Sequence, residues 1–212
     1  MSYLRNICLL TALISTCNIY AEELLPPITV TASRSAIPIN QVSGALTIIS
    51  EQEIEQQNAV YVSDLLQTVP SLNVSTQGSA GSVTQIRIRG SESNHVLVVI
   101  DGVEVNDPAN ASEFNFAHLL ANNIERIEIL RGPQSSLWGS DALAGVINIT
   151  TKRANTGQQF IASSSYGSNN NSQAGLNYLL GSEKFNLVLS GNFIDTDGFN
   201  SATTGHERDG YD

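Results

Sequence analysis

Cysteine is almost absent from this chain of 212 residues, since only Cys8 and Cys17 are present and both lie near the N-terminus. Both fall inside a segment that we expect to be removed after export, so the mature chain has no thiol. A chain without thiols forms no disulfide and holds no metal through cysteine.

Basic residues are also scarce, with 10 Lys and Arg against 20 Asp and Glu. This balance argues against a nucleic-acid partner, because phosphates are bound by basic patches. The motifs GxxxxGK[ST], HExxH and GxSxG are missing too, which removes the usual signals of a phosphate loop, a zinc protease and a hydrolase nucleophile. Because the chain has three histidines, residue counts alone do not exclude a Ser-His-Asp catalytic set. We expect no enzyme and no catalytic cofactor.

The first residues have the order of a secretory signal peptide. Arg5 carries a positive charge, Ile7–Ile14 is mostly apolar, and Ala21 precedes two glutamates. The apolar part is shorter than the roughly 20 residues of a membrane helix. We expect residues 1–21 to be removed after Ala21. The alternative is a lipoprotein anchored at Cys17, although Thr16 is a poor residue before such a cysteine.

The next segment, residues 22–34, contains a short β-prone run. Pro26 and Pro27 stop regular structure, and Ile28–Ala32 (ITVTA) follows them without a hydrophobic face to bury. Such a run is either a disordered terminus or a strand that pairs with a partner through its main chain. Its composition alone leaves both interpretations open.

Residues 35–152 alternate short strand and helix signals, which predicts a small mixed domain with its own core. Ser50 begins a capping-box pattern for a short helix, and a second helix starts at Ser63 and ends before Pro70. Ser75–Ser82 is predicted to be a loop. Strands are expected at Ala45–Ile49, Leu72–Val74, Ile86–Arg89, Val96–Ile100, Val103–Val105, Ile124–Leu130 and Val146–Thr150, with a tight turn at Asp101-Gly102 and one helical turn at Ala117–Leu120.

The end of this region, Ile124–Lys152, has the pattern of a strand, a loop and a second strand. We expect Gly132, Gly139 and Gly145 to let backbone segments pass close to one another, and Trp138 to pin the loop. Periodicity alone supports only two strands and a turn.

The letters of this stretch carry a more specific signal. IERIEILRGP, then S-x-x-x-GS, then A-x-x-GVINI resemble the end of the plug domain of TonB-dependent outer-membrane receptors. Upstream, IRIRGSESNHVLVVIDGVEVN is similar to the cobalamin receptors of that family, in which this stretch sets a loop beneath the ligand. His95 and Asp101 lie in it, and we interpret them as a polar residue at a strand start and a turn residue.

The resemblance implies an α+β plug domain, TonB as periplasmic partner, and a location in the outer membrane of a Gram-negative bacterium. It implies energy-coupled uptake of cobalamin, with a ferric-siderophore or haem receptor as the alternative, and a non-transporting adhesin or a phage or colicin receptor as the rival class. The TonB box would be Ile28, Thr29, Val30, Thr31 and Ala32, and the ligand contacts Val83, Gln85, Glu92, Asn110 and Ala111. The side chains at these five positions are not the ones expected if the site were the same as in cobalamin receptors. A related but different ligand is therefore an alternative.

In residues 153–212 the pattern changes to long segments in which apolar and polar residues alternate. Phe160–Tyr166, Gln173–Leu180 and Phe185–Ile194 place apolar residues on one face and mostly polar ones on the other. A lipid-facing barrel and a half-buried soluble sheet share this period, and the resemblance favours the first strands of a transmembrane β-barrel. About three strands cannot close a barrel, and plugged transporters use about 22, so we expect the chain to be truncated or a fragment.

An acidic loop after the last strand is a candidate calcium site. Calcium takes six to eight oxygen ligands, largely carboxylates and carbonyls. The segments Asp195–Asn200 and Glu207–Asp212 resemble a calcium-ordered extracellular loop of cobalamin receptors, with Asn200, Glu207 and Asp209 at the best-matching ligand positions. A merely solvated acidic loop is the alternative.

Overall fold

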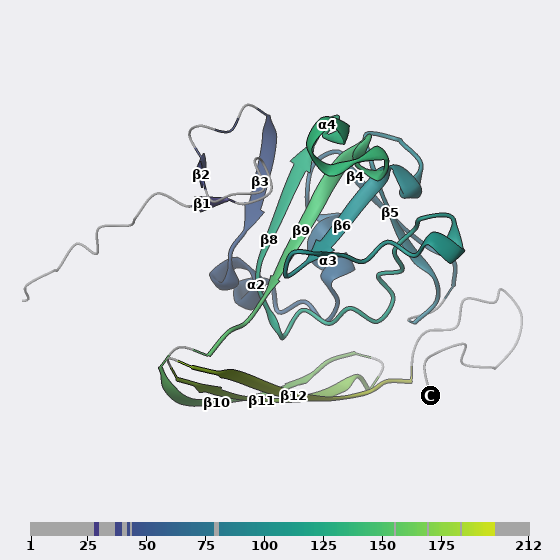
Figure 1. The fold of residues 1–212 in the computed structure, drawn as a ribbon. Coiled ribbons are helices and arrows are strands. Elements are labelled where there is room, and N and C mark those ends of the chain that lie inside the picture. The colour runs from purple at the N-terminus through teal and green to yellow at the C-terminus, as the bar shows by residue number, and fades with distance from the viewer. Residues whose placement is uncertain are drawn as a thin grey trace, which may run out of the picture.

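The computed structural model describes residues 28–29, 37–39, 42, 44–78, 81–154, 156–168, 170–182 and 184–197. Two layers are visible in Figure 1: a mixed domain (residues 44–151) and, below it, a C-terminal sheet (residues 157–195). No helix within these ranges is long and apolar enough to cross a membrane.

The mixed domain is built on a five-stranded sheet with the order β3-β8-β9-β6-β7. Adjacent strands of this sheet pair antiparallel, except that β6 and β9 pair parallel. β4 and β5 form a separate antiparallel ribbon, and β1 (Ile28–Thr29) pairs with β2 (Ile37–Pro38). The strands are β3 (Ala45–Ile49), β4 (Leu72–Thr76), β5 (Thr84–Ile88), β6 (Val96–Ile100), β7 (Val103–Glu104), β8 (Ile124–Arg131) and β9 (Gly145–Thr151). The predicted mixed sheet with short helices is confirmed.

The helices are short and locally specified. Ser50 caps α2 through a capping box with Glu53, as predicted, because each side chain accepts from the other residue's backbone N–H. The helical segments are α2 (Glu51–Gln57), α3 (Val62–Gln67), η2 (Ser93–His95), η3 (Pro108–Asn110), α4 (Ser135–Trp138) and η4 (Ser140–Ala142).

Two local predictions were wrong. Ala117–Leu120 is a turn, not a helix, because Leu120 forms a β-bridge with Tyr61 and the backbone N–H of Val62 donates to Leu119. The loop expected from Ser75 begins later, since β4 extends to Thr76 through its pairing with β5. In both cases pairing with another segment of the chain overrode the local preference.

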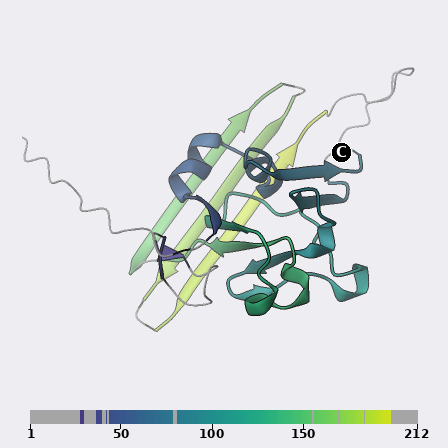
Figure 2. The same ribbon diagram turned by 90° about the horizontal axis from the view of Figure 1, so that it is seen from above.

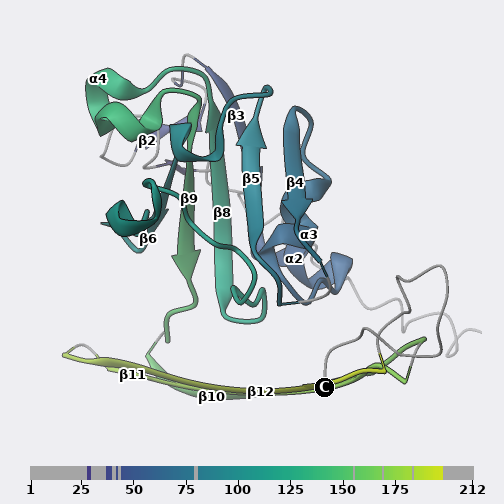
Figure 3. The same ribbon diagram turned by 90° about the vertical axis from the view of Figure 1, so that its right-hand side faces the viewer.

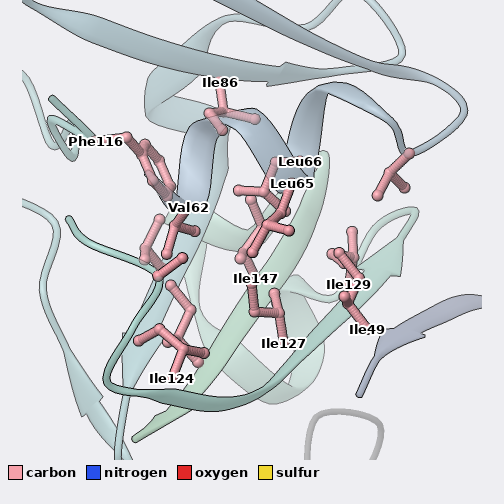
Figure 4. Close-up of a cluster of buried hydrophobic side chains, with 14 of the residues drawn as sticks. Ile49, Val62, Leu65, Leu66, Ile86, Phe116, Ile124, Ile127, Ile129 and Ile147 are labelled. Carbon is pink, nitrogen blue, oxygen red and sulfur yellow. The ribbon is translucent and has the colours of Figure 1, made fainter. Parts of the chain in front are cut away.

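The core fills the space between one face of the sheet, α3 and the β4–β5 ribbon. Leu65 and Leu66 of α3 lie against Ile127 and Ile147 of neighbouring strands (Figure 4). These side chains are buried at or near zero exposure, which makes this the main source of hydrophobic stabilisation.

The opposite face of the sheet has a smaller cluster. Trp138 of α4 packs against Leu97, Val99, Ala142 and Val146, so the predicted anchoring of the loop by this tryptophan is confirmed. Both faces of β9 are therefore covered. Figure 1 shows α4 at the end of β8 and β9 that is farther from the C-terminal sheet.

The three glycines of this loop have different physical roles. A Cβ at Gly145 would lie 2.5 Å from the carbonyl oxygen of Leu130 and 2.9 Å from Cδ1 of Ile88, so here backbone passes close to backbone as predicted. Gly132 and Gly139 instead have positive φ angles of 124° and 89°, with no atom closer than 3.8 Å to an added Cβ. The predicted close approach of backbone segments was therefore wrong at these two positions, where the positive φ angle is what requires glycine.

The C-terminal sheet contains three strands of ten residues in the order β10-β11-β12: β10 (Gly157–Tyr166), β11 (Ser172–Gly181) and β12 (Asn186–Asp195). Figure 2 shows them side by side behind the mixed domain, and Figure 3 shows the sheet edge-on as a separate layer. The register aligns Phe160 with Tyr178 and Tyr178 with Leu189, so apolar side chains share one face. The predicted alternation is confirmed, although Phe185 precedes β12.

Candidate functional site

A closed loop from Asp107 to Glu113 forms the centre of the candidate site. Its two ends pair as an isolated β-bridge, in which the N–H of Asp107 donates to the carbonyl of Glu113 over 3.0 Å. Inside the loop, Asp107 Oδ1 accepts from the N–H of Ala109 over 2.9 Å at the start of η3. The loop is therefore organised by its own backbone and by one carboxylate.

Asn106 fixes this loop to the sheet. Its Oδ1 accepts from the N–H of Val98 over 2.8 Å, and its Nδ2 donates to the carbonyls of Val96 (3.0 Å) and Ser112 (2.8 Å). The side-chain amide thus bonds to the edge of β6 as a neighbouring strand would, and it joins that edge to the far end of the loop.

The loop also contains two strained residues. Ala111 and Ser112 have φ angles of 52° and 59°, in the left-handed region that non-glycine residues rarely adopt. Both follow η3, and the surrounding hydrogen bonds hold them there. Strain of this kind is retained where surrounding structure over-determines the backbone.

Glu113 connects the loop to two further elements. Its carboxylate accepts from Nε2 of Gln85 on β5 and from Oγ of Ser93 in η2, the latter over 2.5 Å. Ser93 is buried, and Gln85 and Glu113 are half-buried. We call this group of Gln85, Ser93 and Glu113 the carboxylate bracket.

Four of the five predicted ligand residues lie on elements that the bracket joins. Gln85 belongs to it, Glu92 is the exposed residue before Ser93, and the exposed Asn110 and Ala111 lie in the loop that Glu113 closes. Val83 is 41% exposed and immediately precedes β5. The chain thus brings these positions to one region, which we call the platform; whether they touch a ligand stays a prediction.

Three residues of the platform were missed by sequence reasoning: Asn106, Glu113 and Asn115. Asn115 Oδ1 accepts from the N–H of Thr84 over 2.9 Å and of Ala117 over 3.1 Å. Asn106 is the last residue of the stretch that resembles cobalamin receptors, and this position could have identified it as a candidate from the sequence. Glu113 had none, because its partners are 28 and 20 residues away.

His95 and Asp101 have structural roles, as interpreted from the sequence. Asp101 and Gly102 have φ angles of 50° and 86° and turn β6 into β7. The Asp101 carboxylate accepts from the N–H of Thr151 over 3.0 Å and from its hydroxyl over 2.6 Å. His95 immediately precedes β6 and accepts from the N–H of Ala144 through its carbonyl.

The N-terminal and acidic-loop predictions fall partly outside the described residues. Ile28 and Thr29 pair with Pro38 and Ile37 of β2, while Val30, Thr31 and Ala32 lie outside the described ranges. The candidate calcium ligands Asn200, Glu207 and Asp209 lie outside them as well. The ranges that are described contain no group of three or more His, Cys, Asp or Glu side chains placed to hold a metal.

The mixed domain meets the C-terminal sheet through polar side chains. Nδ2 of Asn122 donates to Oδ1 of Asn192 over 2.6 Å, and Nδ2 of Asn177 donates to the carbonyl of Asn122 over 3.5 Å. A small cavity of about 100 Å³ beside them is lined by Asn58, Ser163, Gln173 and neighbouring residues. The contact is hydrogen-bonded and incompletely packed.

Comparison with known proteins identifies this arrangement. The family described as TonB-dependent Receptor Plug Domain matches residues 38–146, more than half of the chain. The vitamin B12 transporter BtuB of Vibrio vulnificus (strain CMCP6) is 37% identical over 173 residues, which cover 81% of this chain and 28% of that protein. The chain therefore spans less than a third of the length of this relative.

Solved structures agree on the fold. The siderophore receptor PirA from Acinetobacter baumannii superposes with a TM-score of 0.55 at 26% identity, covering 72% of this chain and 25% of that one. The ferripyoverdine receptor of the outer membrane of Pseudomonas aeruginosa gives a TM-score of 0.70 at 17% identity, with coverages of 81% and 23%. The likeness to the second shows the fold alone.

The chain belongs to the TonB-dependent receptor family, and the mixed domain is its plug domain. This membership places it at the outer membrane, in a family of receptors and transporters that bind small ligands and interact with TonB. The resemblance to the cobalamin receptor group is supported by the identity to the Vibrio transporter.

Proposed function

We propose that this protein takes up cobalamin across the outer membrane in a TonB-dependent manner. The observation that carries the proposal is the 37% identity to a vitamin B12 transporter, together with the folding of its HVLVVIDG stretch into β6 beside the platform. Exposed amide and carboxylate groups of the platform, at Asn110 and Glu92, suit an amide-rich ligand.

The proposed mechanism has two parts. Ligand binds above the platform through Val83, Gln85, Glu92, Asn110 and Ala111, and the segment Ile28–Ala32 becomes available to TonB in the periplasm. TonB then pulls on the plug, using the proton-motive force of the inner membrane. An order–disorder change of a short segment is a known form of switch, and the pairing of β1 with β2 offers one state of it.

Titration of the protein made from its complete gene decides the ligand. We expect cyanocobalamin to bind tightly and a ferric siderophore not to bind. The alternative of a ferric-siderophore or haem receptor draws support from the likeness to PirA. Tight siderophore binding without cobalamin binding would refute the corrinoid assignment.

A proline in the N-terminal segment tests coupling to TonB. Proline at Thr29 or Val30 removes a backbone donor from the strand that would pair with TonB. One backbone hydrogen bond is worth about 1 kcal/mol net, and proline also disturbs its neighbours. We expect uptake to be abolished while ligand binding is retained. Unchanged uptake of radiolabelled cobalamin in both variants would contradict this.

Deletion of Ile28–Ala32 separates transport from attachment. A transporter loses energy-dependent uptake in the deletion variant, whereas a non-transporting adhesin or phage or colicin receptor keeps its attachment activity unchanged. A non-functional fragment shows neither activity with or without the segment.

The acidic loop is proposed to hold calcium through Asn200, Glu207 and Asp209. At the near side of this loop, Oδ2 of Asp197 accepts from Nδ2 of Asn170 over 2.6 Å, which joins its start to the β10–β11 turn. A bound ion would order the loop and raise ligand affinity, because a pre-ordered loop loses less entropy on binding. The test compares cobalamin affinity with calcium and with chelator, in the wild type and in Asp209→Ala. No effect of chelation on the wild type would exclude a functional site.

A further inference from the structure

The carboxylate bracket fixes the direction in which Gln85 points its amide. An ionised carboxylate can only accept hydrogen bonds, so the group that Gln85 turns toward Glu113 must be its NH₂. The same rule makes the buried Ser93 hydroxyl a donor to Glu113. In both hydrogen bonds, Glu113 is therefore the acceptor and its partner is the donor.

The consequence is one acceptor atom of Gln85 that the bracket does not use. With Nε2 committed to Glu113, the remaining amide oxygen of Gln85, Oε1, has no protein partner within the described ranges. Gln85 is half-buried on β5, the strand whose preceding residue Val83 is exposed at the platform. A ligand that reaches Gln85 would meet the amide oxygen of this side chain, whose NH₂ is bonded to the negatively charged carboxylate of Glu113.

We propose that Glu113 is a positioning residue that makes the platform selective for ligand N–H donors, such as primary amides, over ligand carboxylates. This rests on the proposed function and names the ligand chemistry that Gln85 accepts. An amide N–H can donate to Oε1 of Gln85. A carboxylate would face that oxygen without a proton to share and would also be repelled by Glu113.

Glu113→Gln removes the constraint with a minimal change in shape. A glutamine at this position can present either a donor or an acceptor to Gln85, so the amide of Gln85 can rotate and expose its NH₂. The selectivity for amides should then weaken while the packing is retained. Gln85→Met keeps the approximate size of the side chain and removes its whole amide, so both the acceptor oxygen and the NH₂ donor to Glu113 are lost.

The experiment compares cyanocobalamin with its monoacid derivatives, in each of which one ring propionamide is replaced by a carboxylate. Affinities are measured by titration of the protein made from its complete gene, in the wild type, Glu113→Gln, Gln85→Met and the matched charge control Glu104→Gln on β7. We expect the wild type to prefer the amide about tenfold over at least one monoacid, equivalent to one misplaced polar contact. We expect this ratio to fall to about threefold or less in Glu113→Gln and Gln85→Met, and to be unchanged in Glu104→Gln.

Two results would overturn the inference. One is an unchanged amide-to-acid ratio in Glu113→Gln for every derivative; the other is an equal loss of affinity for all ligands, which indicates a purely structural role. A wild type that binds no corrinoid refutes the proposed function and the ligand assignment with it. In that case a double-mutant cycle of Glu113→Ala and Gln85→Ala in thermal unfolding still tests the bracket, because residues that belong to one hydrogen-bond network have non-additive effects on stability and independent sites do not.

Discussion

The two sheets of this protein share an alternation of side chains but differ in the face that they turn toward the plug core. In the plug, β8 and β9 carry Ile127, Ile129, Ile147 and Ile149 into a dry core. In the C-terminal sheet, the apolar face is exposed, whereas the face toward the plug carries polar groups such as Asn177 and Asn192 together with the buried Leu179. The comparison shows that alternation defines two faces, while the surroundings decide which face is buried.

The exposed apolar face is extensive. Phe160 and Phe193 are 66% and 62% exposed, and Leu176 and Leu189 are more than half exposed. Water does not favour such a surface, whereas the hydrocarbon of a membrane does. Membership of an outer-membrane receptor family accounts for it, since the strands of such receptors present apolar residues to lipid.

The largest contrast between the two sheets is expected at their glycines. Gly145→Ala places a Cβ against the Leu130 carbonyl and should destabilise the plug by about 3 kcal/mol, because backbone must move to make room. Gly191→Ala on β12 meets no atom within 4 Å and should change stability by less than about 0.5 kcal/mol. Thermal unfolding of the two variants measures both effects. Equal losses of stability in Gly145→Ala and Gly191→Ala would contradict the expected difference between the two sheets.

Leucine truncation sharpens the same comparison. Leu65→Ala empties a fully buried position in the plug core and should cost about 3 kcal/mol. Leu176→Ala truncates a side chain that is 53% exposed, and in detergent it should cost less than about 1 kcal/mol. Denaturant unfolding of the variants in detergent tests this, and a larger cost for Leu176→Ala would show that the C-terminal sheet has a packed face on that side.

The contact between the sheets is expected to give the smallest effect. Asn122→Ala and Asn192→Ala remove one hydrogen bond between neutral groups beside a small cavity, so their coupling should be about 0.5–1 kcal/mol. A double-mutant cycle in thermal unfolding measures it. A coupling of several kcal/mol would mean that plug and sheet behave as one packed unit.

Much of the plug could be predicted because its signals are local. The Ser50–Glu53 capping box and the Asp101-Gly102 turn each depend on a few adjacent residues. The alternation that places apolar residues on one face within each of β10–β12 follows directly from a period of two. Family resemblance located the platform, but the assignment of its contacts stays a prediction.

The remaining features depended on pairs distant in sequence. The turn at Ala117–Leu120 exists because Leu120 pairs with Tyr61, and α4 is too short to leave a periodic signal. The parallel pairing of β6 with β9 has no local signature either. Such contacts arise only when the whole sheet assembles, so local patterns could not predict them.

The sequence by itself therefore determined the family, the alternating strands and the caps and turns that bound them, because these depend on neighbouring residues. Only the tertiary structure decided that Glu113 meets Gln85 and Ser93, and that Asn192 meets Asn122. A carboxylate among polar loop residues has no partner preference that can be read from its neighbours. Folding brings the donors to it, and the hydrogen bonds to Glu113 then fix which atoms of Gln85 and Ser93 act as donors.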